Sequence, residues 1–207
     1  MTRRRLSAVA KISSLVADAL YTGELCESVL EPLHSIVAYD AVFLAARDRF
    51  TGTHIPMHVN GYNSSQLTFL SEDYQECFSY RAAVLNGSAM RMQDYGARFY
   101  DTPVYRHHLE PAGYREGVTL ALQSGNERSV GLLTMSFRNP LETNEEARHA
   151  LTLVAPILGR LVDTWSTGLV YEFAAAQQST YLVDRQGAIV EVGQPCGTSA
   201  KARELGV

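Results

Sequence analysis

Two histidine pairs carry the residue type that most often binds transition metals, but their spacing does not favour a metal site. His54 and His58 would share one face of a strand about 13 Å apart, since each residue advances roughly 3.3 Å. That separation is too great for one metal ion. His107 and His108 would point about 100° apart on a helix, which is also poor for joint ligation. We therefore expect no metal, and His58 alone is either a ligand contact or an ordinary surface or hydrogen-bonded histidine.

The three cysteines, Cys26, Cys77 and Cys196, are far apart in the sequence and form no CxxC pair. Closely spaced cysteines are the pattern of zinc sites and redox dithiols, so the sequence predicts neither. Free thiols are typical of a reducing compartment. Cys77 falls on the apolar face of a predicted helix, where we expect a small buried side chain rather than a redox sensor.

The sequence contains no recognisable catalytic motif. GxSxG, HExxH, P-loop and paired-carboxylate patterns are all missing from it. Glu145 and Glu146 are adjacent, but they fall in the first turn of a predicted helix, where carboxylates complement the helix dipole. We therefore predict that the protein is not an enzyme and has no catalytic residues and no cofactor.

Aromatic side chains crowd the middle of the chain, and apolar walls with few polar groups are typical of small-molecule pockets. Arg91 or Arg106 would pair with a ligand that carries negative charge. Core packing accounts for several of the aromatic residues equally well, so both interpretations stay open. The aromatic residues concerned are Tyr74, Phe78, Tyr80, Tyr95, Phe99, Tyr100 and Tyr105. The candidate ligand-binding residues are His58, Tyr74, Phe78, Arg91, Tyr95, Phe99, Tyr100 and Tyr105.

Composition indicates a globular protein without a nucleic-acid surface of its own. The 207 residues suffice for one domain with flanking segments, and 46% of them are hydrophobic. The formal net charge is -4, whereas nucleic-acid-binding domains usually carry a basic excess. The basic cluster at residues 3–5 fits a solvated helix start. No apolar stretch approaches the length of a membrane span and the N-terminus lacks a secretory core, so we expect a cytoplasmic protein with no membrane contact.

Hydrophobic periodicity predicts strands placed between helices. Pro56 suggests that its strand lies at a sheet edge or carries a bulge. Thr143 and Glu146 form a T-x-x-E capping box, and Pro156 predicts a kink or a local break in hydrogen bonding within the helix that they open. The predicted helices are 6–20, 25–37, 64–85, one that starts at Thr102-Pro103 and ends at Leu109, and the long one after Thr143. The predicted strands are 41–47, 54–59, 89–92, 117–123 and 128–138.

Strands joined by tight turns pair antiparallel, so this order favours an α+β fold with helices flanking an antiparallel sheet. The pattern changes after Trp165: residues 169–178 continue as helix, 180–192 form a hairpin that turns at 185–187, and a helix begins at 199. Such a tail cannot bury a core alone, so we expect the chain to be truncated. The predicted domains are residues 1–165 and a following segment, 166–207.

Three ordered segments carry a family pattern. They are YDAVFLAARDRFTG (39–52), PVYRHHLEPAGYREGVTLALQ (103–123) and SVGLLTMSFRNPLETNEEARHALTLVAPILGRLVD (129–163). The first is a strand with an Asp/Gly hairpin, and the second is a helix, a Pro-x-Gly break and a strand. The third is a glycine-containing strand that ends in arginine, followed by an acidic helix start and an internal Ala-Pro. Over roughly residues 6–165 the chain resembles the GAF domains of LuxR-type transcription regulators, as found in actinobacteria.

The resemblance implies a GAF-like antiparallel β-sheet flanked by helices, with a C-terminal β-hairpin extension before a helix-turn-helix. It also implies a small-molecule ligand, of unknown identity, between the sheet and the helices. Homodimerisation through the first and last helices is expected, and DNA would be bound by a C-terminal domain that is missing here. This fragment would therefore sense a signal without binding nucleic acid itself.

Departures from the family pattern narrow the choice of ligand. Val130 stands where the family has a large aromatic residue. The Asn-Lys pair of cyclic-nucleotide members is missing, and Leu141 with Glu145-Glu146 is only a weak echo of their Phe-x-x-x-Asp-Glu element. No cysteine lies beside a histidine, as in bilin-binding members, so both ligands are disfavoured. The alternatives are a ligand-free structural dimerisation module and a GAF-fold redox enzyme, which the wide cysteine spacing disfavours.

Overall fold

The computed structural model describes residues 1–17, 27–124, 128–163, 180–183 and 189–192. Its contacts form two compact units, Met1–Thr167 and Gly168–Val207, and each is described by itself. The predicted domain boundary after residue 165 lies outside the described residues and stays a prediction. No helix in the described part of the chain is long and apolar enough to cross a membrane.

The second unit contains one antiparallel hairpin, formed by β6 (Thr180–Val183) and β7 (Ile189–Val192). Both strands fall inside the hairpin predicted over residues 180–192. Its predicted turn at 185–187 lies outside the described residues, as do the helices predicted at 169–178 and from 199 onward.

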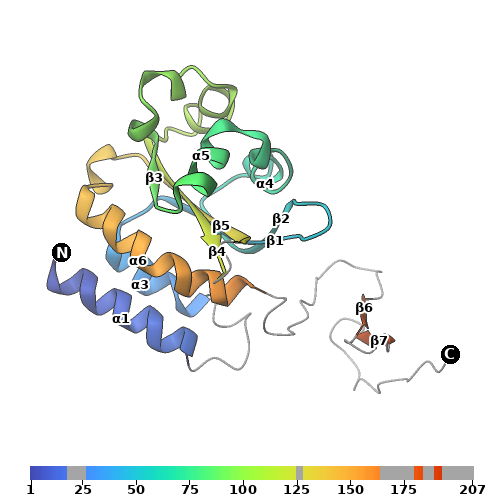
Figure 1. Ribbon diagram of the computed structural model, residues 1–207. Coiled ribbons are helices and arrows are strands. Elements are labelled where there is room, and N and C mark those ends of the chain that lie inside the picture. Colours follow the sequence, from blue (N-terminus) through green and yellow to red (C-terminus); the bar gives the residue numbers. More distant parts are fainter. Residues whose placement is uncertain (18–26, 125–127, 164–179, 184–188, 193–207) are drawn as a thin grey trace. The chain divides into compact units, whose positions relative to one another are not determined.

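Five antiparallel strands form the central sheet of the first unit, in the order β2-β1-β5-β4-β3 (Figure 1). Helical segments cover both faces of this sheet (Figure 1). The predicted α+β class, an antiparallel sheet flanked by helices, is therefore confirmed. The strands are β1 (Ala41–Arg47), β2 (His54–Asn60), β3 (Met90–Arg91), β4 (Glu116–Gln123) and β5 (Ser129–Phe137).

The β1–β2 hairpin places β2 at the sheet edge, as its proline predicted. Pro56 pairs with Ala45, and the register shifts between Leu44 and Ala45. An edge strand tolerates this because proline has no N–H to donate to a neighbouring strand. In the turn, the Asp48 carboxylate accepts the N–H groups of Phe50 and Thr51, and Gly52 takes φ +78°. Glycine adopts that conformation without steric cost.

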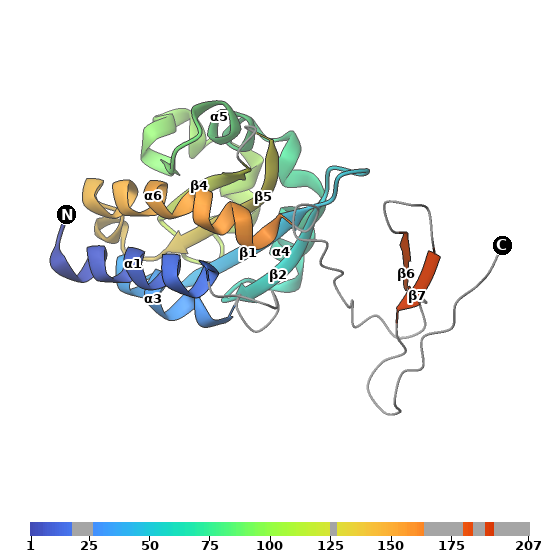
Figure 2. The ribbon, with the colours of Figure 1, turned by 60° about the horizontal axis from the view of Figure 1, so that its bottom comes forward.

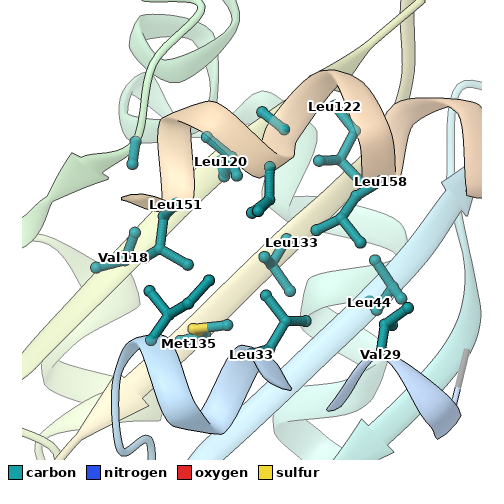
Figure 3. Close-up of a cluster of buried hydrophobic side chains, with 14 of the residues drawn as sticks. Val29, Leu33, Leu44, Val118, Leu120, Leu122, Leu133, Met135, Leu151 and Leu158 are labelled. Carbon is teal, nitrogen blue, oxygen red and sulfur yellow. The ribbon is translucent and has the colours of Figure 1, made fainter. Parts of the chain in front are cut away.

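Three helices lie along one face of the sheet (Figures 1 and 2): α1 (Arg3–Ala17), α3 (Leu30–Ile36) and α6 (Glu145–Val162). Between them and the sheet lies an aliphatic core in which Leu33, Leu133 and Leu158 are at most 1% exposed (Figure 3). Complete burial of one such side chain contributes roughly 1.5–3 kcal/mol. α6 continues through Pro156, which has no N–H to donate to the preceding turn, so the local loss of hydrogen bonding does not end the helix.

The start of α6 corrects the predicted capping box. Asn144 is the N-cap, and its side-chain oxygen accepts the Ala147 N–H at 3.0 Å. A 3-10 turn precedes this helix, so the Thr143 hydroxyl donates to the Pro140 carbonyl at 3.3 Å instead of capping. Glu146 forms an ion pair with α1. The prediction that Thr143 and Glu146 cap the helix was therefore wrong by one residue.

Short helical segments cover the other face of the sheet. The single helix predicted over 64–85 is wrong, because the chain makes a π-helical turn in which the Tyr74 N–H donates to the Phe69 carbonyl. A 3-10 turn follows, and extended backbone at Cys77 separates it from the next helix. The segments are α4 (Ser64–Thr68), η1 (Phe69–Asp73), η2 (Tyr74–Glu76), α5 (Phe78–Asn86), η3 (Met92–Tyr95), η4 (Ala97–Phe99) and η5 (Val104–Leu109).

Candidate functional site

A cavity of about 40 Å³ lies between the sheet and these short helical segments. Strands β4 and β5 form its floor, where Thr119, Thr134 and Ser136 supply hydroxyl groups. Segments η1 and η5 contribute walls on the opposite side through Phe69, Leu70, Val104 and His108. A cavity of about 10–15 Å³ holds one water molecule, so this cavity has room for very few atoms in this state.

The floor hydroxyls differ in whether they have a partner. Thr119 and Thr134 are directly opposed on β4 and β5. The Thr119 hydroxyl bonds that of Tyr74 at 2.6 Å, and Ser136 bonds the Tyr62 hydroxyl at 2.8 Å.

Thr134 lies between these two pairs and is only 5% exposed. The Tyr62 hydroxyl is close enough for Thr134 to favour its ionised form, but Tyr62 is already bonded to Ser136, and Thr134 Oγ1 has no partner of full hydrogen-bond geometry. A buried hydroxyl without a partner costs roughly 1–3 kcal/mol, so such a group needs an explanation.

The titratable groups of the cavity are neutral near pH 7. Burial raises the pKa of Tyr62 and of Tyr74 above the usual tyrosine value, so both phenols stay protonated. Burial, together with the neighbouring His107, lowers the pKa of His108, so its ring is uncharged. Hydroxyl, imidazole and amide groups are therefore the polar contacts that the cavity offers.

Gln66 ties two walls of the cavity together. Its side chain completes a capping box with Asn63, in which both hydrogen bonds measure 2.9 Å. The same side chain, only 4% exposed, donates through Nε2 to the His108 carbonyl. The His108 ring stacks on Phe69, with 4.3 Å between the ring centroids. The start of α4 and the end of η5 are thus held together above the floor.

Flexible side chains complete the cavity. Met90 and Met92 line it near β3, and methionine fills irregular gaps because its chain is unbranched and polarisable. Gly117 on β4 makes room for Met92, since a Cβ there would lie 2.6 Å from the Met92 methyl carbon. A methionine can change rotamer at low cost, so this wall is the one best suited to yield to a ligand.

Two of the predicted site residues, Tyr74 and Phe99, line the cavity. Four others pack around Phe99 as a neighbouring aromatic cluster, with ring centroids 5.5–6.2 Å from it. These four are Phe78, Tyr95, Tyr100 and Tyr105. His58 lies on edge strand β2 and is not among the lining residues. The structure therefore places two of the predicted residues in the cavity and four in the aromatic cluster beside it, and it leaves His58 and Arg91 outside both.

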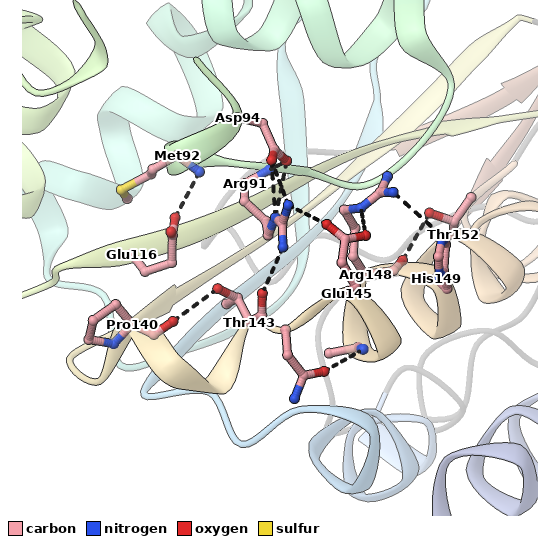
Figure 4. Close-up of polar contacts among 12 residues, drawn as sticks. Arg91, Met92, Asp94, Glu116, Pro140, Thr143, Glu145, Arg148, His149 and Thr152 are labelled. Carbon is pink, nitrogen blue, oxygen red and sulfur yellow. Dashed lines mark hydrogen bonds and ion pairs between the residues drawn. The ribbon is translucent and has the colours of Figure 1, made fainter. Parts of the chain in front are cut away.

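Arg91 is engaged in a structural network rather than in the cavity (Figure 4). Its guanidinium pairs with Asp94 at 2.7 Å and with Glu145, and donates to the Thr143 carbonyl at 3.2 Å. These contacts join β3 and η3 to the start of α6. Arg106, the other predicted partner for an anionic ligand, pairs with Asp101. Neither guanidinium lines the cavity.

The floor residues Thr119, Thr134 and Ser136 were not predicted from the sequence. Their signal was available, because Thr134 and Ser136 are two residues apart in an otherwise apolar strand and so share one face. Hydroxyl groups on the buried face of a core strand need partners, which marks that face as different from ordinary core.

Cys77 has no place in this cavity. It precedes α5 as N-cap, and burial raises the pKa of its thiol to about 11, which leaves little thiolate near pH 7. Cys26 and Cys196 lie outside the described residues. Among the described residues, no three His, Cys, Asp or Glu side chains converge as metal ligands.

No protein-family model matches the chain, and no curated protein matches it significantly. A GAF domain of a phosphoenolpyruvate-protein phosphotransferase from Coxiella burnetii has a TM-score of 0.60 at 19% identity, covering 80% of this chain and 96% of that one. Free methionine-R-sulfoxide reductase from Neisseria meningitidis, in complex with its substrate, reaches 0.59 at 15% identity, covering 80% and 92%. A phycoerythrobilin-bound GAF domain from a cyanobacterial phytochrome reaches 0.57 at 12%, covering 79% and 96%. The predicted GAF-like fold is thus confirmed.

Proposed function

We propose that this chain is a cytoplasmic, non-catalytic sensory domain that binds a small molecule in the cavity above β4 and β5. The observation that carries the proposal is the unpartnered Thr134 hydroxyl on the floor of that cavity. Apolar pockets with a few convergent polar groups are the usual form of small-molecule sites. Here the polar groups are hydroxyls on two rigid strands, and adaptable side chains lie around them.

Binding requires the cavity to open. Ligand pockets usually measure about 300–1,000 Å³, far more than the cavity of about 40 Å³ in this structure. Two of its walls, η1 and η5, are π-helical turns, which are less stable than α-helix and occur often at functional sites. A ligand would displace Met90 and Met92 and shift these turns.

The small cavity also favours the second candidate function, a ligand-free structural module that only dimerises. In that case Thr134 would be a tolerated defect of a closed core. A third candidate, a redox enzyme on the same fold, is weaker because the one described cysteine has a poorly ionised thiol outside the cavity. The likeness to the Neisseria reductase is one of fold.

We further propose that the domain belongs to a LuxR-type transcription regulator and acts as a homodimer. Support comes from the three sequence segments that resemble this group, and from apolar residues exposed on α1 and α6. DNA binding would then reside in a separate helix-turn-helix domain. The genomic coding sequence after Val207 tests this affiliation directly, because a helix-turn-helix is expected there.

A thermal-shift screen of the full chain against a chemically diverse panel of small molecules tests ligand binding. We expect at least one compound to raise Tm, and we expect Val104→Phe, which fills the cavity from η5, to abolish that shift. Leu85→Phe on the exposed surface of α5 is the matched control and should keep it. If no compound stabilises the protein, or if Val104→Phe leaves every shift intact, the sensory proposal fails and the structural module is favoured.

A further inference from the structure

None of the described residues that line the cavity is an Asp, Glu, Lys or Arg, so its walls carry no charged side chain of these types. An ionised ligand group would lose its hydration there and gain no counter-charge, which costs several kcal/mol even after relaxation. Arg91, which was predicted to pair with an anionic ligand, is already paired with Asp94 and Glu145.

Among the three hydroxyl groups on the floor of the cavity, Thr134 Oγ1 is the one without a hydrogen bond of full geometry. Thr119 and Ser136 are satisfied by Tyr74 and Tyr62, which leaves Thr134 Oγ1 between two completed pairs. A hydroxyl donates one hydrogen bond and accepts others, so it can pair with an O–H, an N–H or a carbonyl. A ligand with one such group would remove the cost of the unpaired hydroxyl on binding.

The other side chains that line the cavity are mostly apolar, and two of them are aromatic. Phe69 and Phe99 present rings to the cavity, and Met90 and Met92 supply adaptable thioethers. Thioether sulfur and aromatic edges both interact favourably with aromatic rings. Such walls fit a ring-shaped, hydrophobic body better than a polar or extended one.

We propose that the ligand of this cavity is a small neutral molecule with an apolar, preferably aromatic, ring and one hydrogen-bonding group that pairs with Thr134 Oγ1. This inference rests on the proposed sensory function and specifies its ligand class. It excludes carboxylates, phosphates and ammonium compounds as ligands of the same cavity.

Titration of the full chain with phenol, toluene, benzoate and benzylamine at pH 7, followed by NMR or calorimetry, tests the proposal. We expect phenol to bind about three- to tenfold more tightly than toluene, the ratio that one net hydrogen bond supplies. Benzoate and the protonated benzylamine should not bind. In Thr134→Val, which keeps the side-chain shape, phenol and toluene should bind equally. Thr51→Val in the β1–β2 turn is the control that should keep the preference.

Benzoate or benzylammonium binding as tightly as phenol would overturn the proposal, and so would a phenol preference that survives Thr134→Val. If phenol and toluene both fail while another compound still stabilises the protein in a manner that Val104→Phe abolishes, the ligand class is wrong and the sensory function stands. If no compound of the thermal-shift panel raises Tm, the sensory function itself fails.

Discussion

His54 lies on β2 and is 2% exposed. Neither ring nitrogen makes a hydrogen bond of full geometry, and the contact with the Leu70 backbone offsets the effect of burial on the ring only in part. Its ring meets Tyr80 edge-on at 5.2 Å. Burial, reinforced by the positive charge of Arg47, lowers its pKa to about 4. An unfolded histidine binds its proton near pH 6.5, so protonation favours the unfolded chain. The stability that depends on the neutral ring is therefore complete above pH 6.5 and is lost as the pH falls toward 4.

The free energy of unfolding should fall by about 3 kcal/mol between pH 7 and 4 through His54 alone, since one pKa unit corresponds to about 1.4 kcal/mol. In His54→Phe, which keeps the aromatic contact, most of this loss should disappear. Urea unfolding at several pH values measures it, with the exposed His149→Gln as control. A pH profile of His54→Phe identical to that of the unchanged protein would mean that His54 is protonated at no cost in the folded state.

At the scale of elements, the sequence predicted the strands better than the short helices. Strand β1 was predicted at its observed bounds, because six buried apolar residues and a final arginine run between clear turn signals. Residues 64–86 were misjudged because a spacing of three and four residues fits an α-helix and also fits alternating π-helical and 3-10 turns. The cavity is lined by residues of two of these irregular turns, η1 and η2, so the part of the fold hardest to predict is also part of the candidate site.

One experiment distinguishes Asn144, the N-cap of α6 in the structure, from Thr143, the cap that the sequence predicted. Asn144→Ala removes the acceptor for the Ala147 N–H and for the Arg5 guanidinium, both at 3.0 Å. We expect a loss of about 1 kcal/mol in unfolding free energy, the usual cost of an N-cap. Thr143→Val should cost less, because its hydroxyl makes only a long bond to the Pro140 carbonyl. Urea denaturation compares the two. A larger loss for Thr143→Val would restore the capping box predicted from the sequence.

At the scale of the whole first unit, the sheet connects the cavity with the helices on its opposite face. Thr134 and Leu133 are neighbours on β5, but alternation points the first into the cavity and places the second in the core below α6 (Figure 3). A ligand that shifts β5 would therefore change the packing beneath α6. Such coupling requires that the ligand favour one arrangement of α1 and α6 over another.

The proposed dimer is the arrangement on which this coupling would act. Leu6 of α1 and Leu153 of α6 are 51% and 53% exposed, and these two helices lie side by side (Figure 2). Apolar residues at the centre of an interface commonly contribute more than 1 kcal/mol each, and a buried unpaired charge there opposes association. We therefore expect Leu153→Glu to raise the dimer dissociation constant at least about tenfold, which corresponds to about 1.4 kcal/mol.

Sedimentation equilibrium over a range of protein concentrations measures the effect. Leu85→Glu is the matched control, because Leu85 is 88% exposed on α5, on the other face of the sheet, and should leave association unchanged. An unchanged dissociation constant for Leu153→Glu would place the interface away from α6. A monomer in the unaltered chain at every concentration would remove the dimer from the proposed function. Ligand binding in the cavity would then have to affect the segment after residue 165 within a single chain.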